Sequence, residues 1–437
     1  MPVSRNNEVK NRAVIVGGVR TPFLRAFGAF TKMDAIALST AATKALLEQT
    51  KVPHDAIDGV VWGGVILPSG APNIAREVVI DSGLPLTIEG ATVTRACTSG
   101  TLAVTQAVAA IERGEAQVMI AGGSDSTSSA EVKMPQSFVH KTAPVLMSSK
   151  AGVVDYFKLL AQISVRKDLL PQRPQIRERS TGELMGEAAE RMVRHWGVTR
   201  EEQDVFAAQS HQRAAAAVAS GRFDSEIARV STPEGNVVDK DTILRADTSV
   251  EKLARLRPVF AKEGGTITAG NSSGLTDGAA AMLLMSESKA KELGFTPLAF
   301  VESWSYDAVD PADQLLIGPA ISMPRALDRA GLDLRDIDIV DIHEAFSGQV
   351  LCVLRALASD DFARKHVCKD TATGVLAPEE INVHGGSVAL GHPFGATGVR
   401  MLTTMANELH LTGKRTALLS LCAAGGQSAA VILRAAD

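Results

Sequence analysis

The sequence has few aromatic residues, no surplus of positive charge and no long apolar run. Aromatic residues make up 4% of the 437 positions, and the formal net charge is −4 at pH 7. A chain without a basic surplus lacks the electrostatic field that attracts nucleic acid, so we expect no nucleic-acid partner. No apolar run reaches the roughly 20 residues of a membrane-spanning helix. The N-terminal residues also lack the apolar segment of a secretory signal.

Cysteine is scarce as well. The chain has 4 cysteines, which are widely spaced and form no C-x-x-C pair: Cys97, Cys352, Cys368 and Cys422. This spacing argues against a disulfide framework and against the commonest zinc motifs. We therefore expect no bound metal and a reducing compartment, which we take to be the cytoplasm.

Short apolar runs alternate with helical segments along the chain. Residues 13–18, 59–66 and 117–123 are apolar runs that contain or end in glycine, as buried strands often do. Apolar strands that alternate with helices indicate an α/β sheet covered on both faces. After residue 294 a similar order returns, with a strand, a loop that carries a reactive residue, a glycine-rich helix start and a strand followed by Gly-Gly. We interpret this recurrence as a duplicated α/β core.

The pattern predicts two core halves, the first of them interrupted by an insert. The segments are the first part of the N-terminal half, an inserted loop domain, the remainder of the N-terminal half and the C-terminal half: residues 1–123, 124–250, 251–293 and 294–437. Within the insert, residues 153–165 could form a helix with one apolar face, and basic residues follow it. Such a segment suits a membrane surface, a partner protein, or a lid packed on its own core. The sequence leaves these alternatives open.

Two cysteines and two histidines fall where strands end or helices begin: Cys97, His343, His392 and Cys422. Ligands and chemistry in α/β proteins gather at the carboxyl ends of strands. Cys97 precedes an Ala-rich helical run, and the N-terminus of a helix favours the thiolate, the nucleophilic form of cysteine. Taken one at a time, these residues could also be inert core groups or zinc ligands.

Four short motifs resemble, in order, the active-site motifs of the thiolase family. They are Arg95–Gly100, His343–Phe346, Gly391–Pro393 and Cys422–Gly426, while residues 265–278 resemble the coenzyme A (CoA) loop and residues 20–23 the N-terminal signature. Several motifs in the order of one family are far more specific than any one alone. The resemblance implies a thiolase-like fold of two similar mixed-sheet halves in an αβαβα arrangement, with an inserted loop domain.

One departure from the common family pattern is informative. Most thiolases have Asn where His343 stands, and the His variant together with the long insert is similar to the thiolase (β) subunit of the fatty-acid trifunctional enzyme and its bacterial counterparts. The resemblance thus implies a 3-ketoacyl-CoA thiolase of fatty-acid β-oxidation, whose substrates are acyl-CoA and CoA. It also implies a homodimer or homotetramer, and suggests a hydratase/dehydrogenase subunit as partner and a peripheral membrane contact.

The resemblance also implies a role for each site residue. Cys97 is the nucleophile that carries the acyl group, His392 its base, and Cys422 the acid and base for the second carbon and for CoA. His343 and His392 form one oxyanion hole, with a water, and the backbone N–H groups of Cys97 and Ala424 form the other. The implied CoA contacts are Arg245, Ser273, Met185, Ala345 and Phe346.

Two other functions stay open at this point. A biosynthetic acetoacetyl-CoA thiolase would use the same steps in the direction of condensation. A non-catalytic thiolase-like protein that binds CoA thioesters should lack a motif residue, and none is missing from this sequence. A ketoacyl synthase, which uses one Cys and two His, fits less well because of Cys422.

Overall fold

The computed structural model describes residues 11–171 and 177–436. Most strands belong to one mixed sheet, in the order β10-β11-β12-β9-β1-β8-β5-β3-β4, with β2 paired to β8. The strands of the N-terminal half are β1 (Ala13–Arg20), β2 (Leu24–Arg25), β3 (Gly59–Gly64), β4 (Glu89–Val93), β5 (Val118–Asp125) and β8 (Thr276–Ser286). Those of the C-terminal half are β9 (Ala299–Ala308), β10 (Ile339–Ile342), β11 (Thr416–Ala423) and β12 (Gln427–Ala435).

The two halves repeat one pattern of strand directions. In the first half β3 pairs with β5 in parallel. On the other side of β5 lies β8, which is antiparallel to both β5 and β1. In the second half β10 is parallel to β11, and β11 is followed by the antiparallel strands β12 and β9. The halves meet between β1 and β9, where Val14 pairs with Phe300 and Ile15 with Ala299. This repetition supports the interpretation of a duplicated core.

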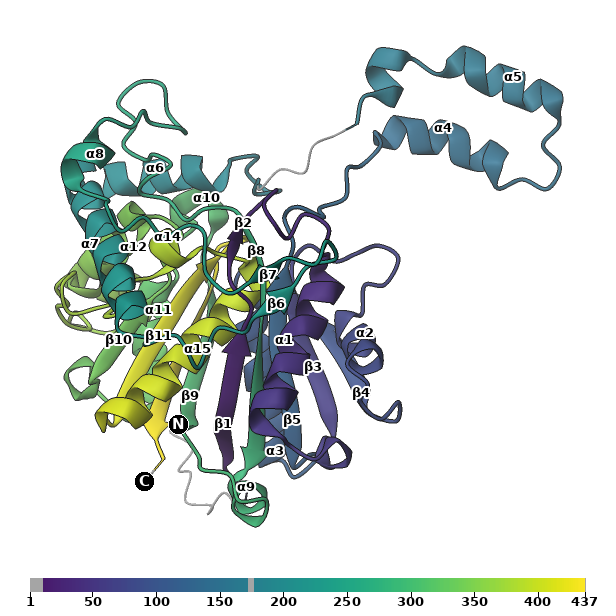
Figure 1. The fold of residues 1–437 in the computed structure, drawn as a ribbon. Coiled ribbons are helices and arrows are strands. Elements are labelled where there is room, and N and C mark those ends of the chain that lie inside the picture. Colours follow the sequence, from purple (N-terminus) through teal and green to yellow (C-terminus); the bar gives the residue numbers. More distant parts are fainter. Residues whose placement is uncertain (1–10, 172–176, 437) are drawn as a thin grey trace. The chain divides into compact units, whose positions relative to one another are not determined.

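Helices lie on both faces of the strands (Figure 1). The longer ones are α1 (Ala35–Thr50), α2 (Ile74–Asp81), α3 (Ser99–Glu112), α6 (Met185–His195), α7 (Arg200–Ala219), α11 (Pro319–Ala330), α12 (Ser347–Leu357) and α15 (Phe394–Thr412). Shorter elements are α8 (Val250–Ala254), α9 (Glu287–Glu292), α10 (Pro311–Gln314), α13 (Asp360–Phe362), α14 (Ser387–Leu390), the 3₁₀ turns His54–Ala56 and Leu334–Asp336, and the π turn Ala363–Val367. A small second sheet pairs β6 (Val230–Ser231) with β7 (Val237–Val238).

Three apolar clusters define the layers. One packs α1 and α2 on the outer face of the N-terminal strands, and another packs α11, α12 and α6 on the outer face of the C-terminal strands. The third places α3 and α15 between the two sets of strands. Strand side chains alternate between layers, since Leu418 joins the outer cluster and Leu419 the central one. The result is the layered αβαβα arrangement that the sequence predicts.

Helix α1 shows how local sequence fixes an element. The Asp34 carboxylate accepts a hydrogen bond from the N–H of Ala37 and caps the first turn. Leu38, Ala42 and Leu46 recur at helical spacing and are buried against the strands. The helix ends at Lys51, whose φ of 53° lies in the left-handed region.

Contacts divide the chain into two compact units, one of which is Ala130–Arg177 and the other the remainder. The small unit contains α4 (Gln136–Leu146), α5 (Val153–Gln162) and the π turn Val165–Leu169. Its buried Asp168 carboxylate accepts hydrogen bonds from the Lys141 ammonium at 2.8 Å and the Ser164 N–H at 2.7 Å. This unit is shorter than the insert expected at 124–250, because residues 178–250, with α6 and α7, pack in the larger unit.

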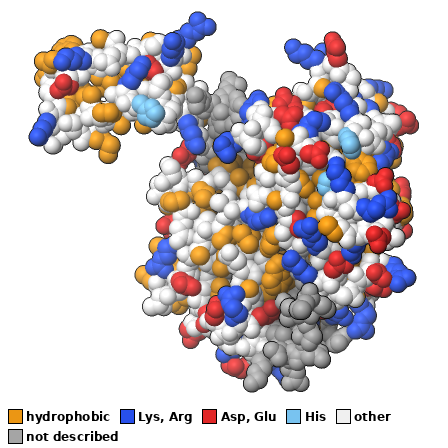
Figure 2. Space-filling view, turned by 180° about the vertical axis from the view of Figure 1, so that it is seen from behind, with side chains coloured by type: hydrophobic (Ala, Val, Ile, Leu, Met, Phe, Trp, Pro, Cys, Tyr) orange, Lys and Arg blue, Asp and Glu red, His pale blue; other side chains and the backbone are white. Residues whose placement is uncertain are grey.

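Hydrophobic side chains gather on the surface of the small unit, next to Lys and Arg side chains (Figure 2). Within the expected helix 153–165, the exposed apolar residues are Val153, Val154, Tyr156, Phe157, Leu160 and Val165. The basic stretch expected after this helix lies partly outside the described residues. Of the helices in the described ranges, none is long and apolar enough to cross a membrane.

Candidate active site

Cys97 lies in a tight turn between β4 and α3. Ala96 in this turn has a φ of 47°, a conformation that side chains other than glycine adopt only under constraint. The Ser99 hydroxyl supplies that constraint, because it accepts from the Arg95 N–H at 2.7 Å and donates to the Ala96 carbonyl at 2.6 Å. The Arg95 guanidinium then ties the turn to β12 through the Ser428 carbonyl at 3.1 Å. The nucleophile is therefore held on a fixed support.

Glycines bring the segments of Cys97 and His392 together. A Cβ atom at Gly100 would lie 2.1 Å from the carbonyl oxygen of Gly395, and one at Gly398 would lie 2.2 Å from the hydroxyl of Thr101. The first turns of α3 and α15 thus touch through their backbones. Cys97 stands three residues before Gly100, and His392 stands three residues before Gly395. The contact therefore places Cys97 and His392 at the same end of the pair of helices.

His392 and His343 lie side by side, with ring centroids 4.1 Å apart. The backbone N–H of His392 donates to the Thr276 hydroxyl at 2.8 Å, while the N–H of His343 donates to the Ser420 carbonyl at 2.8 Å. Each ring has its Nδ1 hydrogen-bonded, to Thr397 in one case and to Ser387 in the other. Both Nε2 atoms are buried and have no hydrogen-bond partner among the described residues. These two atoms are available to a bound substrate.

The second cysteine completes the cluster. Cys422 lies near the end of β11, two residues beyond Ser420, whose carbonyl accepts from the His343 N–H. The backbone N–H groups of Ala424 and of Cys97 itself both lower the pKa of the Cys97 thiol, so both lie close to its sulfur. Burial raises the pKa of Cys422, and the negative charge of a Cys97 thiolate raises this pKa further. Cys97 thus lies near Cys422 and Ala424, while His343 and His392 lie next to each other. No group of side chains in the described ranges is arranged to hold a metal ion.

The resting site is uncharged. Burial raises the pKa of Cys97 to about 12, the negative charge of Asp125 raises it as well, and the two N–H donors only partly offset this. Burial and then Arg400 lower the pKa of His392 to about 3, and burial, His392 and Arg400 lower that of His343 well below its usual value. Burial thus opposes the effect of the helix N-terminus, which the sequence analysis expects to favour the thiolate.

Four of the five residues expected to contact CoA belong to one region. The Ser273 N–H donates to the Ala345 carbonyl at 3.0 Å. Met185 and Ala345 pack against the apolar cluster that contains Phe346. Phe260, which no sequence motif indicates, joins them, since its ring stands edge-on to that of Phe346 with centroids 6.0 Å apart. Its only signal in the sequence is that it is an aromatic residue in a chain with few of them.

The fifth residue, Arg245, is exposed, and no contact among the described residues joins it to the other four. Its backbone N–H donates to Nδ1 of His211 on α7 at 3.3 Å. Burial and the Arg245 charge lower the pKa of His211 to about 4, so this ring is neutral near pH 7. The Arg245 charge also contributes, after Lys252, to lowering the pKa of the nearby Asp247.

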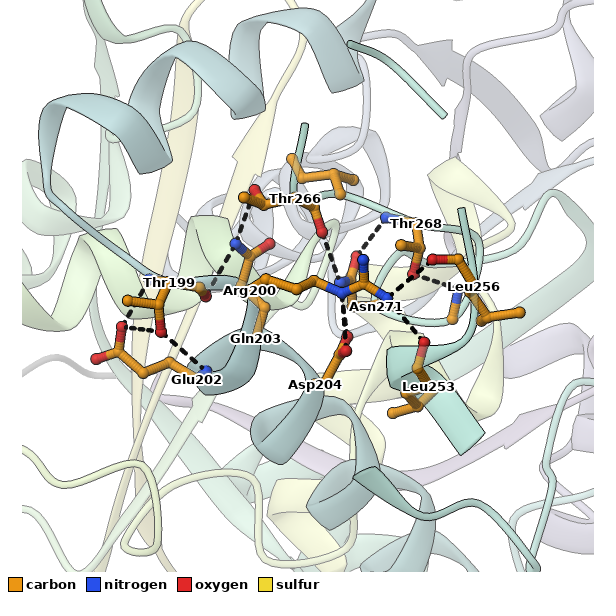
Figure 3. A network of polar contacts seen from close by, with 12 residues as sticks. Thr199, Arg200, Glu202, Gln203, Asp204, Leu253, Leu256, Thr266, Thr268 and Asn271 are labelled. Atoms are coloured by element: carbon orange, nitrogen blue, oxygen red, sulfur yellow. Dashed lines mark hydrogen bonds and ion pairs between the residues drawn. The ribbon is translucent and has the colours of Figure 1, made fainter. Parts of the chain in front are cut away.

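Helix α7 holds the loop that leads to Ser273 (Figure 3). The Asn271 side chain donates to the Asp204 carboxylate at 3.0 Å and accepts from the Thr268 N–H at 2.8 Å. The Asp204 carboxylate also pairs with Arg200 at 2.7 Å, and Gln203 donates to the Thr266 hydroxyl at 3.0 Å. This network fixes the backbone of the loop and leaves Ser273 and its neighbours to face the site region.

Two buried carboxylates hold the catalytic loops: Glu344 belongs to the motif His343–Phe346, whereas no sequence motif indicates Asp125. Asp125 accepts the N–H groups of Ile66 and Gly395, each at 2.6 Å, and so joins β3, β5 and the start of α15. Glu344 accepts from the Ser210 hydroxyl and from the Asn382 amide, each at 2.7 Å. Burial raises the pKa of both carboxyl groups, that of Asp125 to about 6.

Comparison with known proteins agrees with this geometry. The family model of the thiolase N-terminal domain matches residues 13–288, and that of the C-terminal domain matches residues 295–435. The chain is 41% identical to a 3-ketoacyl-CoA thiolase of Cronobacter sakazakii and 42% identical to one of Escherichia fergusonii, each over 97% of both chains. The chain belongs to the thiolase family.

Solved structures are similar over nearly the whole chain. Human mitochondrial 3-ketoacyl-CoA thiolase in complex with CoA has a TM-score of 0.82 and 32% identity, and the alignment covers 98% of each chain. Bacillus anthracis acetyl-CoA acetyltransferase has a TM-score of 0.81 and 32% identity, over 98% of this chain and 99% of that one. The fold class expected from the sequence is confirmed.

Proposed function

We propose that this chain is a 3-ketoacyl-CoA thiolase, which cleaves a 3-ketoacyl-CoA with a second CoA into acetyl-CoA and an acyl-CoA two carbons shorter. One observation carries the proposal. Two backbone N–H groups and a second thiol lie close to Cys97, whose helix touches the backbone of the helix that follows His392. His392 in turn lies against His343, and both Nε2 atoms are unpartnered among the described residues. The full-length similarity to 3-ketoacyl-CoA thiolases supports the same activity.

In the first half-reaction, the Cys97 sulfur attacks the C3 carbonyl of the substrate and its proton passes to Nε2 of His392. A neutral thiol with a raised pKa needs such a base at the moment of attack. The C2–C3 bond then breaks, its electron pair goes to the enolate of acetyl-CoA, and the Cys422 thiol donates its proton to C2. The products are acetyl-CoA and acyl-Cys97.

In the second half-reaction, the Cys422 thiolate takes the proton of the incoming CoA thiol, whose sulfur attacks the acyl carbon. The tetrahedral intermediate expels the Cys97 thiolate, which recovers its proton from His392. The N–H groups of Cys97 and Ala424 suit the oxygen anion that develops on the acyl carbon. His392 and His343 suit the enolate oxygen.

Met185, Phe260, Ser273, Ala345 and Phe346 are the residues we propose for the pantetheine arm of CoA, and Arg245 for its phosphates. Their support is the packing of the first five around one apolar cluster and loop. CoA is in this view a substrate, and the enzyme needs no tightly bound cofactor. The division of the sequence into segments 1–123, 124–250, 251–293 and 294–437 is proposed as well, although residues 178–250 of the insert, which include Met185 and Arg245, pack with the core halves.

The test is the acyl-enzyme. After mixing with a 3-ketoacyl-CoA in the absence of free CoA, mass spectrometry should find the acyl group on the peptide that contains Cys97. Cys97→Ala should abolish both this adduct and turnover, while Cys368→Ser, which changes an exposed cysteine, should keep both. A wild-type enzyme that forms no adduct would favour a non-catalytic CoA-thioester-binding protein. Thiolysis confined to acetoacetyl-CoA would favour the biosynthetic alternative over a role in β-oxidation.

We further propose a homodimer or homotetramer. The support is strand β4, which pairs with β3 on one side and ends the sheet on the other, so that its backbone groups can pair with a second copy. Sedimentation or light scattering should give a mass at least twice 46.0 kDa. A monomer at micromolar concentration would contradict this proposal.

The exposed apolar and basic residues of Ala130–Arg177 support two further proposals, a hydratase/dehydrogenase subunit as partner and a peripheral contact with membrane. Co-purification tests the first, and sedimentation with anionic vesicles tests the second. Phe157→Glu should weaken whichever contact forms, and an unchanged result for both would contradict the proposals. A cytoplasmic location is proposed from the four cysteines, which are free thiols in the structure.

A further inference from the structure

A chain of hydrogen bonds reaches His343 from the side opposite the substrate. Nδ1 of His343 lies 2.9 Å from the Ser387 hydroxyl, and that hydroxyl accepts a hydrogen bond from the Arg400 guanidinium at 3.2 Å. All three side chains are buried, with Ser387 fully excluded from solvent. These hydrogen bonds connect the end of β10, the first residue of α14 and the second turn of α15.

The direction of this chain is set by Arg400. A guanidinium is a donor only, so it occupies a lone pair of the Ser387 oxygen and leaves the hydroxyl hydrogen free to donate. Nδ1 of His343 is the one acceptor that the described residues place within reach of that hydrogen. A buried hydroxyl hydrogen without an acceptor is costly. Nδ1 must therefore be unprotonated, and the proton of the neutral ring must be on Nε2.

The neighbouring histidine is held in the opposite way. Nδ1 of His392 lies 2.6 Å from the Thr397 hydroxyl, which itself donates to the Pro393 carbonyl at 3.4 Å. Under the proposed mechanism Nε2 of His392 must keep a free lone pair for the Cys97 proton, so the ring proton lies on Nδ1 and is donated to the Thr397 oxygen, while the Thr397 hydrogen turns toward the Pro393 carbonyl. Nε2 of His392 is then unprotonated. Two adjacent rings of the same kind thus carry their protons on different nitrogens.

We propose that Arg400, acting through Ser387, holds His343 as a hydrogen-bond donor toward the substrate, while Thr397 leaves His392 as an acceptor. This inference rests on the proposed function and adds two positioning residues, Ser387 and Arg400, to it. A proton on Nε2 of His343 lets this atom donate directly to the developing enolate oxygen. The free lone pair on Nε2 of His392 takes the proton from Cys97.

The charge around the two rings agrees with this assignment. Burial, with the Arg400 charge in addition, lowers the pKa of both His343 and His392, so each ring keeps a single proton. The counter-charge of Arg400 is Asp341, whose carboxylate lies 3.8 Å from the guanidinium. A ring that stays neutral can be a fixed donor or a fixed acceptor, and the hydrogen-bond chains decide which.

The direct test is the protonation of the two rings in the intact enzyme. Solid-state ¹⁵N NMR on enzyme labelled at histidine, with signals assigned by their loss in His343→Asn and in His392→Ala, separates protonated from unprotonated ring nitrogens. We expect His343 protonated on Nε2 and His392 protonated on Nδ1 near pH 7. A protonated Nδ1 on His343 would overturn the inference, whatever the activity of the enzyme.

Kinetics of Ser387→Ala provide a second test. Loss of the hydroxyl should lower kcat for thiolysis about tenfold, because Nε2–H of His343 is no longer held in place. The KM for CoA and the rate of Cys97 alkylation should not change. Ser387→Thr should restore activity, and Ser288→Ala on the surface helix α9 is the matched serine control. In a His343→Asn background, Ser387→Ala should cause no further loss, because its effect passes through His343.

The outcomes separate the inference from the function on which it rests. If Ser387→Ala keeps full kcat, or lowers it equally with and without His343, the positioning role is refuted while the acyl-Cys97 mechanism still stands. If His343→Ala, which unlike the Asn found in most thiolases has no polar group, keeps full activity, the proposed oxyanion role of His343 fails. The NMR measurement on the wild-type enzyme determines the two proton positions even if Ser387→Ala does not fold.

Discussion

For the substitution Gly100→Ala, helix propensity predicts a gain in stability, whereas tertiary packing predicts a loss. Gly100 is the second residue of α3, and alanine is favoured over glycine in a helix by about 1 kcal/mol. On propensity alone the variant should be more stable than the wild type. The new Cβ, however, would lie 2.1 Å from the Gly395 carbonyl oxygen, whereas ordinary contact begins at 3.4 Å. The two backbones must therefore separate by roughly 1 Å.

Gly395 cannot move away to make room. A Cβ built on Gly395 would itself meet the Gly63 carbonyl at 2.6 Å, so its backbone already touches β3 on the far side. Its N–H is also bonded to the buried Asp125 carboxylate. The displacement must then appear at the start of α3, where Cys97 lies. We expect the free energy of unfolding to fall by about 1–3 kcal/mol and kcat/KM to fall about 100-fold.

The assay is steady-state thiolysis of a 3-ketoacyl-CoA, combined with urea unfolding of the same preparations. Gly70→Ala is the matched control, because a Cβ at Gly70 meets nothing within 4 Å. The control should be nearly unchanged in both measurements. A Gly100→Ala enzyme at least as stable and as active as the wild type would refute the backbone contact between α3 and α15, and with it the placement of Cys97 beside His392.

Three further predictions test the electrostatics of the site. Alkylation of Cys97 by iodoacetamide should rise about tenfold per pH unit above neutrality without a plateau below pH 9, because burial raises its pKa to about 12; a plateau near pH 7 would reveal a resting thiolate. Cys422→Ser should slow transfer of the acyl group to CoA, measured by single-turnover kinetics, more than it slows acylation of Cys97, and an equal loss in both steps would count against its role. Burial raises the pKa of Asp125 to about 6, so its ionisation weakens the fold as pH rises from about 4 to 6. As pH rises over this range, the free energy of unfolding in urea should therefore increase for Asp125→Asn relative to the wild type. A difference between the two proteins that does not depend on pH would contradict the burial of this charge.

Local sequence predicted several of the strands well. The apolar runs at 13–18, 59–66 and 117–123 became β1, β3 and β5 with small changes of length, because such runs combine β-forming residues with glycine ends. The insert was harder to delimit. Residues 178–250 look like part of it in the sequence, yet α6 and α7 bury their apolar faces in the larger unit, a long-range contact that composition does not reveal.

The sequence by itself determined which groups the chemistry has: two thiols, two imidazoles and their glycine-rich neighbours, in an order that one family shares. Such motifs are readable because residue identity and short spacing do not depend on the rest of the fold. Only the tertiary structure decided their protonation. The neutral thiol of Cys97, the proton positions assigned to His343 and His392, and the contact of Phe260 with Phe346 depend on burial and on partners far away in the chain. Desolvation and hydrogen-bond direction are properties of an environment, and no single segment of the sequence contains that environment.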